Sequence, residues 1–181
     1  MKTIRSFVSA VLALLLLAPV AQAQLGLSQM SALKTACLAD VLVCKPLHDA
    51  ADDVGLVSYF NTTAPTYIVW RTNVQIDEIM RNGMDWARVD NLSVGKARIW
   101  DWMGRLGTLD CSKANIRAGI DATWVGTAAD LAVRATVYTH CKRAATRAEQ
   151  TLATGAGTDA SPSVMSFQGS ISVAEASLIR S

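Results

Sequence analysis

The sequence predicts a mainly α-helical protein, a compact multi-helix domain with one or two short strands. Along most of the chain, apolar residues recur every third or fourth position, which is the period of a helix that buries one face. Only the runs 67–70 and 164–167 have the β-branched and aromatic character of a strand. We therefore expect a helical domain over 24–153 behind a signal-like segment at 1–23. Over 154–181 we expect a flexible connector, a short strand and a terminal helix that packs on the domain.

The N-terminus has the form of a secretory signal peptide. Lys2 and Arg5 precede an apolar run over 7–20, and a small-x-small site ending at Ala23 follows it. The run is shorter than the about 20 apolar residues that span a bilayer, so we expect cleavage after Ala23 and no membrane anchor. The alternative is that Met30 is the true start of the protein.

The first half of the mature chain predicts three helices and a strand. Apolar residues at helical spacing mark 27–43, and a second helix begins near Pro46, which suits a first turn. The polar stretch 61–65 ends that second helix. After the strand candidate, the spacing predicts a short helix over 76–84.

The second half predicts three longer helices. The first begins at Asp90 or Asn91, either of which can cap it. Its buried stripe is predicted to consist of Leu92, Ile99, Trp102, Met103 and Leu106. Ser112 then caps a helix with apolar residues at strict four-residue spacing, namely Ile116, Ile120 and Trp124. An alanine-rich stretch over 128–153 predicts the longest helix. In the C-terminal segment, Ser172 and Glu175 have the spacing of a capping box, which opens the terminal helix.

The four cysteines are Cys37, Cys44, Cys111 and Cys141. In an exported protein they permit up to two disulfides. On one continuous helix Cys37 and Cys44 lie about 10 Å apart, which is too far for a bond. Cys111 and Cys141 can pair if their helices pack together. Four free thiols that act as small core residues are the alternative.

No catalytic, cofactor-binding or metal-binding constellation is visible in the sequence. The patterns of a nucleophile elbow, a phosphate loop, a zinc protease and a CxxC motif are all missing. The only histidines are His48 and His140, and nothing local places either beside a cysteine. We therefore expect no enzyme, no cofactor and no metal. An envelope-acting enzyme that uses Cys141 and His140 is a remote alternative.

The charge balance argues against broad electrostatic partners. The chain has 17 basic and 15 acidic residues, and two of the basic ones, Lys2 and Arg5, lie in the signal-like segment. The remaining 15 basic residues balance the 15 acidic ones. A neutral domain has no general attraction for nucleic acid or anionic membranes, so we expect neither as a partner.

Four residues are candidates for partner binding, namely Trp86, Trp100, Arg143 and Arg147. Trp100 lies off the predicted apolar stripe, and exposed aromatic residues are enriched at interfaces. Burial of Trp100 or Trp86 under a second helix is the alternative. Arg143 and Arg147 are one turn apart on the predicted helix, so they form a basic cluster that either meets an acidic partner or is a solvated face.

Six segments spread over most of the chain carry a resemblance to a known family. They are Tyr59-Phe60-Asn61, Ile68-Val69-Trp70-Arg71-Thr72, the run 89–100, the run 115–120, the region 143–149, and the Gly155-x-Gly157 connector with the strand and helix that follow it. With these segments, the chain from Met30 onward resembles a family of small, uncharacterised proteins encoded in tailed-bacteriophage and prophage genomes. The resemblance implies a phage context and a virion part made in the cytoplasm, and it supplies no catalytic residues. Such proteins typically begin near the position of Met30, so the residues before it are an addition.

These observations predict a phage structural or assembly protein of the virion's head–tail or tail region. Such a protein would act through contacts with other phage structural proteins or with itself. The signal-like segment favours a different function, an exported periplasmic or secreted binding protein that is carried by a prophage and acts at the host envelope. The two expectations conflict, because virion parts assemble in the cytoplasm and need no export signal.

Overall fold

The computed structural model describes residues 25–181, so the predicted signal segment at 1–23 lies outside the described residues. The chain is mainly α-helical, as predicted. Its helices are α2 (Leu27–Ala39), α3 (Cys44–Asp49), α4 (Asp53–Asn61), α5 (Ile76–Arg81), α6 (Trp86–Asp90), α7 (Val94–Gly104), α8 (Ala114–Thr123), α9 (Ala128–His140), α10 (Arg147–Leu152) and α11 (Val173–Arg180). Its strands are β1 (Thr63–Trp70), β2 (Val74–Gln75), β3 (Thr108–Leu109) and β4 (Lys142–Thr146).

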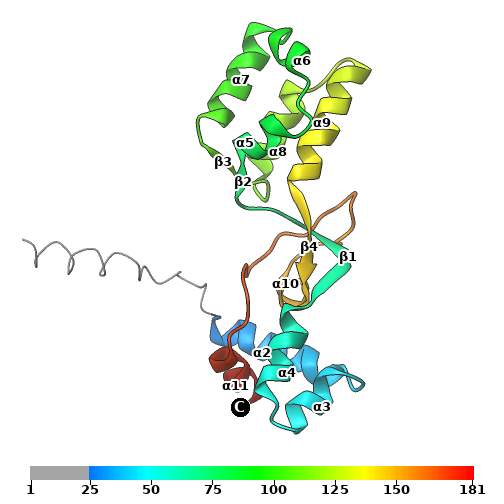
Figure 1. Cartoon of the computed structure of the whole chain (residues 1–181), viewed down its shortest axis with the longest axis vertical. Helices are drawn as coiled ribbons and strands as arrows, with labels where there is room; N and C mark the ends of the chain where they lie inside the picture. Colours follow the sequence, from blue (N-terminus) through cyan, green and yellow to red (C-terminus); the bar gives the residue numbers. More distant parts are fainter. Residues whose placement is uncertain (1–24) are drawn as a thin grey trace, which may run out of the picture.

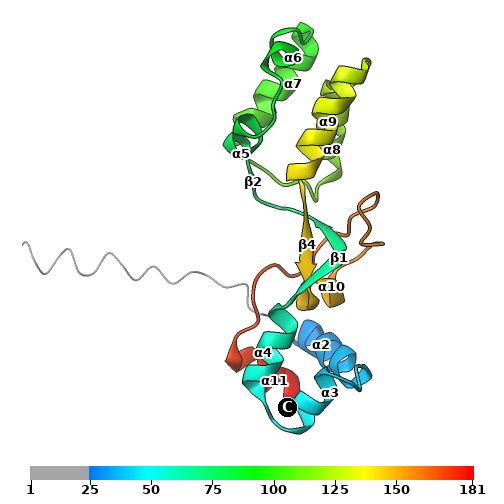
Figure 2. The same cartoon turned by 45° about the vertical axis from the view of Figure 1, so that its right-hand side comes forward.

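The helices form two lobes that are joined by two strands (Figures 1 and 2). The lower lobe comprises residues 25–62 and 147–181, and the upper lobe comprises residues 71–141. Between them, β1 and β4 pair as an antiparallel two-stranded ribbon. The upper lobe is therefore an insertion between the two strands of the ribbon, while both ends of the described chain lie in the lower lobe.

The lower lobe is held together by contacts between distant parts of the sequence. Its buried cluster joins Leu33, Leu56 and Phe60 from the N-terminal helices to Ile171 and Ile179 from the C-terminal segment. Each fully buried side chain of this kind contributes about 1.5–3 kcal/mol. The C-terminal helix is thus part of this core.

The upper lobe has its own core, built from one continuous stretch of chain. Its buried cluster includes Ile79, Trp100, Ile120, Trp124 and Val137. The rings of Trp100 and Trp124 meet edge to face, with centroids 5.3 Å apart. The short strands β2 and β3 pair at the base of this lobe, next to the ribbon (Figure 1).

The ribbon carries a third segment on its second edge. Ser163 forms a parallel bridge with Val69, and the Ile68 N–H donates to the Gly157 carbonyl at 2.7 Å. Gly157 has a φ of +67°, and a Cβ there would lie 2.2 Å from the Tyr67 ring, so only glycine fits. The 154–162 connector thus runs against β1, and the register of β1 with β4 shifts where Pro65 interrupts the ladder.

Two of the predicted helices are interrupted in the lower lobe. The helix predicted over 27–43 ends at Ala39, where the Asp40 side chain accepts N–H groups of the following turn. The helix predicted from Pro46 splits in two because Ala51 takes a φ of 56°. Asp52 then caps α4, accepting the Gly55 N–H at 2.8 Å.

The long helix predicted over 128–153 is wrong in its second half. It ends at His140, and after Cys141 the residues Lys142–Thr146 form β4 because their backbone pairs with β1. A capping box of Thr146 and Glu149 then opens α10. The second predicted strand, 164–167, reduces to one bridge between Val164 and Thr154. The capping box predicted for the terminal helix is confirmed at Ser172.

Candidate functional site

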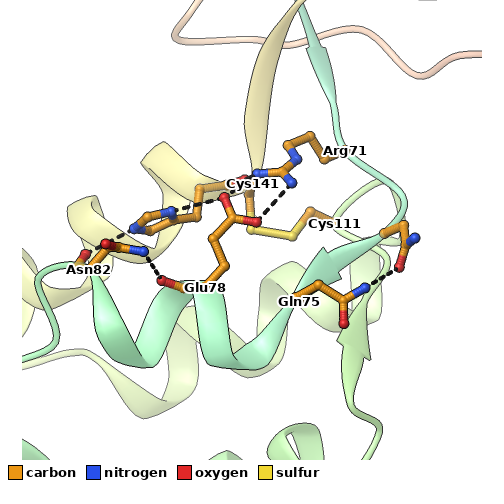
Figure 3. A network of polar contacts seen from close by, with 8 residues as sticks. Arg71, Gln75, Glu78, Asn82, Cys111 and Cys141 are labelled. Carbon is orange, nitrogen blue, oxygen red and sulfur yellow. Dashed lines mark hydrogen bonds and ion pairs between the residues drawn. A yellow bond between two sulfur atoms is a disulfide. The ribbon is translucent and has the colours of Figure 1, made fainter.

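A polar cluster fixes the base of the upper lobe (Figure 3). The Arg71 guanidinium donates two hydrogen bonds to the Glu78 carboxylate, at 2.6 and 2.9 Å, and one to the His140 carbonyl at 2.9 Å. The His140 ring lies 3.4 Å from Glu78 through Nδ1 and 3.0 Å from the Asn82 carbonyl through Nε2. Hydrogen bonding from Arg71 lowers the pKa of Glu78 below its usual range. The Glu78 side chain is therefore ionised, and its hydrogen bonds join α5 to the end of the ribbon and to α9.

The same residues tie the two cysteines of this lobe together. The Arg71 N–H donates to the Cys141 carbonyl at 2.8 Å, and the Arg71 carbonyl accepts the Cys111 N–H at 3.0 Å. Cys111 and Cys141 form a disulfide with Cα atoms 5.6 Å apart, which realises the pairing that the sequence permitted (Figure 3). Because its sulfur is bonded, Cys141 offers no thiol for the remote alternative of catalysis with His140.

A groove of 690 Å³ runs beside the ribbon, between α8, α9 and the 154–162 connector. Trp70 and Tyr138 form its aromatic wall, with Arg117 stacked 4.9 Å from the Trp70 ring centroid. The Tyr138 hydroxyl donates to Asp121 at 3.0 Å. Burial, and then this hydrogen bond, raise the pKa of Tyr138 to about 12. Its phenol therefore stays protonated and acts as a hydrogen-bonding wall of the groove.

Two cations of this groove are paired with carboxylates of the protein, while Arg117 donates to the Cys111 and Ser112 carbonyls. Arg134 lies 3.6 Å from Asp121, and Lys142 donates to the Asp159 carboxylate at 3.2 Å. Such a groove can hold a polar ligand or segment. Among residues 25–181, no group of three or more His, Cys, Asp or Glu side chains could hold a metal ion.

The end of α2 and the turn between α2 and α3 present four exposed aliphatic side chains to solvent. We call residues 37–44 the apolar loop. Its exposed members are Leu38, Val41, Leu42 and Val43, and Leu42 is 85% exposed. Cys37 and Cys44 close the loop with a disulfide whose Cα atoms are 5.0 Å apart. The bond forms because α2 ends before Cys44, so the one-helix geometry that the sequence analysis assumed does not apply.

Hydrogen bonds give the apolar loop a defined shape. One oxygen of Asp40 accepts the N–H groups of Leu42 and Val43, at 3.3 and 3.1 Å. Its other oxygen accepts the Tyr59 hydroxyl at 2.8 Å, and the Arg147 guanidinium covers the Tyr59 ring at 4.4 Å. The hydrogen bond from Tyr59, followed by that from the Val43 N–H, lowers the pKa of Asp40. A loop held in this way presents its apolar side chains with little loss of freedom on binding.

The two predicted tryptophans differ in exposure. Trp86 is 59% exposed, so it is available to a partner. Trp100 is 7% exposed and packs on Trp124, so the prediction that it faces a partner is wrong. The exposed indole of α7 is Trp102, at 60%, which corrects the predicted apolar stripe together with the exposed Leu106.

The two predicted arginines do not form a cluster on one helix. Arg143 lies on β4 and binds the buried Glu149 carboxylate through two hydrogen bonds of 2.7 Å. Burial alone would raise the pKa of Glu149, but the bonds from Arg143 and the Thr146 N–H lower it below its usual range. Arg147 begins α10 and stacks on Tyr59. Both arginines therefore serve the interior contacts of the lower lobe.

The apolar loop was not among the candidate sites predicted from the sequence. Its signal was present, because three consecutive large aliphatic residues precede Cys44 and Asp40 is a turn-favouring residue. The continuous helical spacing of 27–43 obscured it.

Comparisons with known proteins give no relative: no protein family, curated protein or solved structure matches this chain. No helix within the described part of the chain is both long and apolar enough to cross a membrane.

Proposed function

We propose that the protein is a structural or assembly component of a bacteriophage, associated with the virion at its head–tail or tail region and acting through protein–protein contacts. The observation that carries the proposal is the apolar loop. It exposes four aliphatic side chains on a turn closed by a disulfide and braced by Asp40. Exposed apolar groups that lie together on a preorganised element are a usual feature of an interaction surface.

The polar residues support the same proposal. The carboxylates of Glu78, Asp130 and Glu149 each bind an arginine that links separate elements. They therefore hold the architecture in place, while the large exposed side chains, such as Leu42 and Trp86, lie on the surface. The phage family that the sequence resembles adds the context of a virion.

A direct test examines particles that are made with and without the gene. We expect purified wild-type particles to contain the protein, and particles from a deletion strain to show incomplete head–tail joining or tail formation by electron microscopy. A Leu42→Ser variant should be present in cells and depleted from particles, while the equally exposed Leu27→Ser control should be incorporated normally. Normal particles in the absence of the gene would contradict the proposal.

A second function is favoured by a specific observation. All four cysteines of the described chain are paired, and disulfides persist mainly in oxidising compartments. Together with the signal-like segment, this favours an exported binding protein in the periplasm or the medium, with the groove beside the ribbon as its binding surface. The intact mass of the protein from producing cells separates the two functions. A chain that begins at Gln24 supports export, and one that begins at Met30 removes that support.

The proposal includes the relation between the lobes. The two lobes are expected to keep one relative position, because the β1–β4 ribbon joins them, and the Cys111–Cys141 disulfide and the bond of Arg71 to Glu78 brace the point where this ribbon enters the upper lobe. Small-angle X-ray scattering tests this. We expect one radius of gyration that agrees with the structure, and a larger value after Glu78→Ala.

A further inference from the structure

The upper lobe carries an apolar groove that matches the apolar loop in character. We call the space between α5, α6 and α7 the apolar groove. It has a volume of 340 Å³ and is lined mainly by apolar side chains, namely Ile76, Met80, Val89, Leu92, Ala97 and Trp100. The loop lies on the lower lobe and the groove on the upper lobe, with the ribbon between them (Figure 1). A loop closed by a disulfide on one lobe does not reach the other lobe of the same molecule.

We infer that the apolar loop of one copy inserts into the apolar groove of a second copy, so that the chains associate head to tail. This inference rests on the proposed function and names the partner of the same loop. Because the two contacting surfaces are different, the contact is heterologous. Each copy keeps a free loop at one end and a free groove at the other, so the association continues to a closed ring or an open filament. Both forms suit a virion component.

The charges beside the loop and beside the groove support a second copy as the occupant. Lys45 and Asp49 form an ion pair along α3, which follows the loop directly. Asp101 and Arg105 form an ion pair at 2.7 Å along α7, at the rim of the groove. The order of charge is opposite on the two helices. When α3 of one copy runs in the same direction as α7 of the next, Lys45 faces Asp101 and Asp49 faces Arg105.

This charge pattern also separates a second copy from a membrane. Each rim is neutral overall, because its cation and anion are paired four residues apart. A neutral rim gives no attraction to anionic lipid. The charged rim does align a partner whose charges have the complementary order, since opposite charges placed face to face favour one docking geometry.

Two substitutions test the contact, one on the exposed loop and one at the half-buried wall of the groove. Leu42→Ser removes the most exposed aliphatic group of the loop. Gly104→Glu places a charged side chain at the wall of the groove, and a Cβ at Gly104 meets no heavy atom within 4 Å. The matched controls are Leu27→Ser, at 86% exposure, and Gly95→Glu, which lies on the same helix with equally open space and away from the groove.

The measurement is size-exclusion chromatography with light scattering of the full mature chain over a range of concentrations. We expect the wild type and both controls to form species larger than a monomer as concentration rises. In the proposed contact the Leu42 side chain is buried by the second copy. Leu42→Ser should therefore raise the dissociation constant about ten- to a hundredfold, and Gly104→Glu should have an effect at least as large. Circular dichroism confirms that each variant is folded.

Mixing the two variants gives the decisive result. Leu42→Ser keeps a working groove and Gly104→Glu keeps a working loop, so an equimolar mixture should form a one-to-one dimer and nothing larger. A wild type that stays monomeric at all concentrations overturns the inference, and so does a mixture that stays monomeric. If Leu42→Ser still abolishes incorporation into particles while the wild type is monomeric, the proposed function stands and only the second copy is wrong. Binding of the wild type to phosphatidylglycerol vesicles that is lost in Leu42→Ser would replace the second copy with a lipid surface.

Discussion

The two lobes have similar helical content but are assembled from the sequence in different ways. The upper lobe is a continuous stretch, 71–141, whose disulfide spans 30 residues. The lower lobe joins the N-terminal helices to α10 and α11 from the end of the chain, and its disulfide spans only 7 residues. The upper lobe therefore forms its core from one continuous segment, while the lower lobe forms its core only when both ends of the described chain come together.

The distribution of tryptophan makes this difference measurable. All five tryptophans lie between Trp70 and Trp124, so they belong to the upper lobe or to the end of the ribbon that packs on it. The lower lobe contains Tyr59, Phe60 and Phe167 but no tryptophan. Tryptophan fluorescence therefore reports the upper lobe alone, whereas far-ultraviolet circular dichroism reports the helices of both lobes.

The largest expected effect follows from removal of the C-terminal segment. A chain that ends at Ser170 lacks Ile171, Ala176 and Ile179, which are all buried in the lower core. We expect the lower lobe to lose its cooperative unfolding transition while the tryptophan emission spectrum stays that of the intact protein. Emission shifted to the wavelength of exposed tryptophan would mean that the upper lobe depends on the lower one.

A single core truncation in the lower lobe should cost less. Phe60 is 1% exposed, and replacing it with alanine removes a buried ring and leaves a cavity. We expect Phe60→Ala to lower the free energy of unfolding of the lower lobe by about 3–5 kcal/mol. The transition seen by circular dichroism in urea should split, with its first part invisible to fluorescence. Val54→Ala, at an exposed position of the same helix, should change stability by less than about 0.5 kcal/mol.

The two disulfides should differ in their contribution. By the loop-closure relation, removing Cys111–Cys141 costs about 3–4 kcal/mol and removing Cys37–Cys44 about 2–3 kcal/mol. We expect the paired alanine variant at Cys111 and Cys141 to lower the urea midpoint measured by fluorescence. The paired variant at Cys37 and Cys44 should lower only the transition measured by circular dichroism. Equal shifts in both probes for either variant would contradict independent lobes.

Acid should weaken both lobes through different carboxylates. The upper lobe contains Asp130, whose pKa is lowered to about 2, first by hydrogen bonding from Arg88 and then from Thr127. The lower lobe contains Glu149, whose pKa is also lowered. A carboxylate with a depressed folded-state pKa stabilises the protein above its unfolded pKa, and this stability is lost as pH falls through the folded value. We expect stability to be level above pH about 5 and to decline below pH about 4.

A substitution assigns this decline to one lobe. Glu149→Gln removes one of the carboxylates of the lower lobe whose pKa is lowered, the others being Asp40 and Glu175, so the pH dependence of the circular-dichroism transition should become shallower. The fluorescence transition should keep its decline. A flattened fluorescence transition would show that Glu149 also supports the upper lobe.

The sequence was sufficient for the elements that depend on local signals. The helical spacing predicted α5 and α8 closely, and the Ser172–Glu175 capping box marked the start of α11. The spacing was insufficient where tertiary pairing decides the conformation. Residues 142–146 belong to the alanine-rich stretch that predicted a helix. They pair with β1 instead, because the hydrogen bond between Arg71 and Cys141 and the disulfide of Cys141 hold the two strands together at their upper-lobe ends.

The orientation of α7 could not be derived from its periodicity. At roughly 100° per residue, Trp100 and Trp102 lie about 80° to either side of the line through Ile99 and Met103. The pattern is therefore symmetric with respect to the two indoles. The structure selects Trp100 because Trp124 on α8 provides an edge-to-face partner, and Trp102 is left in solvent.

The apolar loop could not be predicted from the spacing of its apolar residues, because that spacing indicates a continuous helix where the structure has a turn. Val41 and Leu42 fit the period of a helix together with the apolar residues before them, so they were assigned to its buried face. In the structure Asp40 ends that helix by accepting two N–H groups of the turn, and the disulfide closes it. The sequence therefore identified the apolar residues, but it did not show that they are exposed to solvent instead of buried.

Photo-crosslinking from position 42 tests most directly the proposed contact between the apolar loop of one copy and the apolar groove of a second copy. A benzoylphenylalanine in place of Leu42, in a mixture of ¹⁵N-labelled and unlabelled full-length chains, marks whatever the loop touches. We predict crosslinks between differently labelled chains, to peptides that contain Met80 or Leu92, and their loss when the second chain carries Gly104→Glu. Crosslinks from loop to loop, or crosslinks confined to a single chain, would contradict the account.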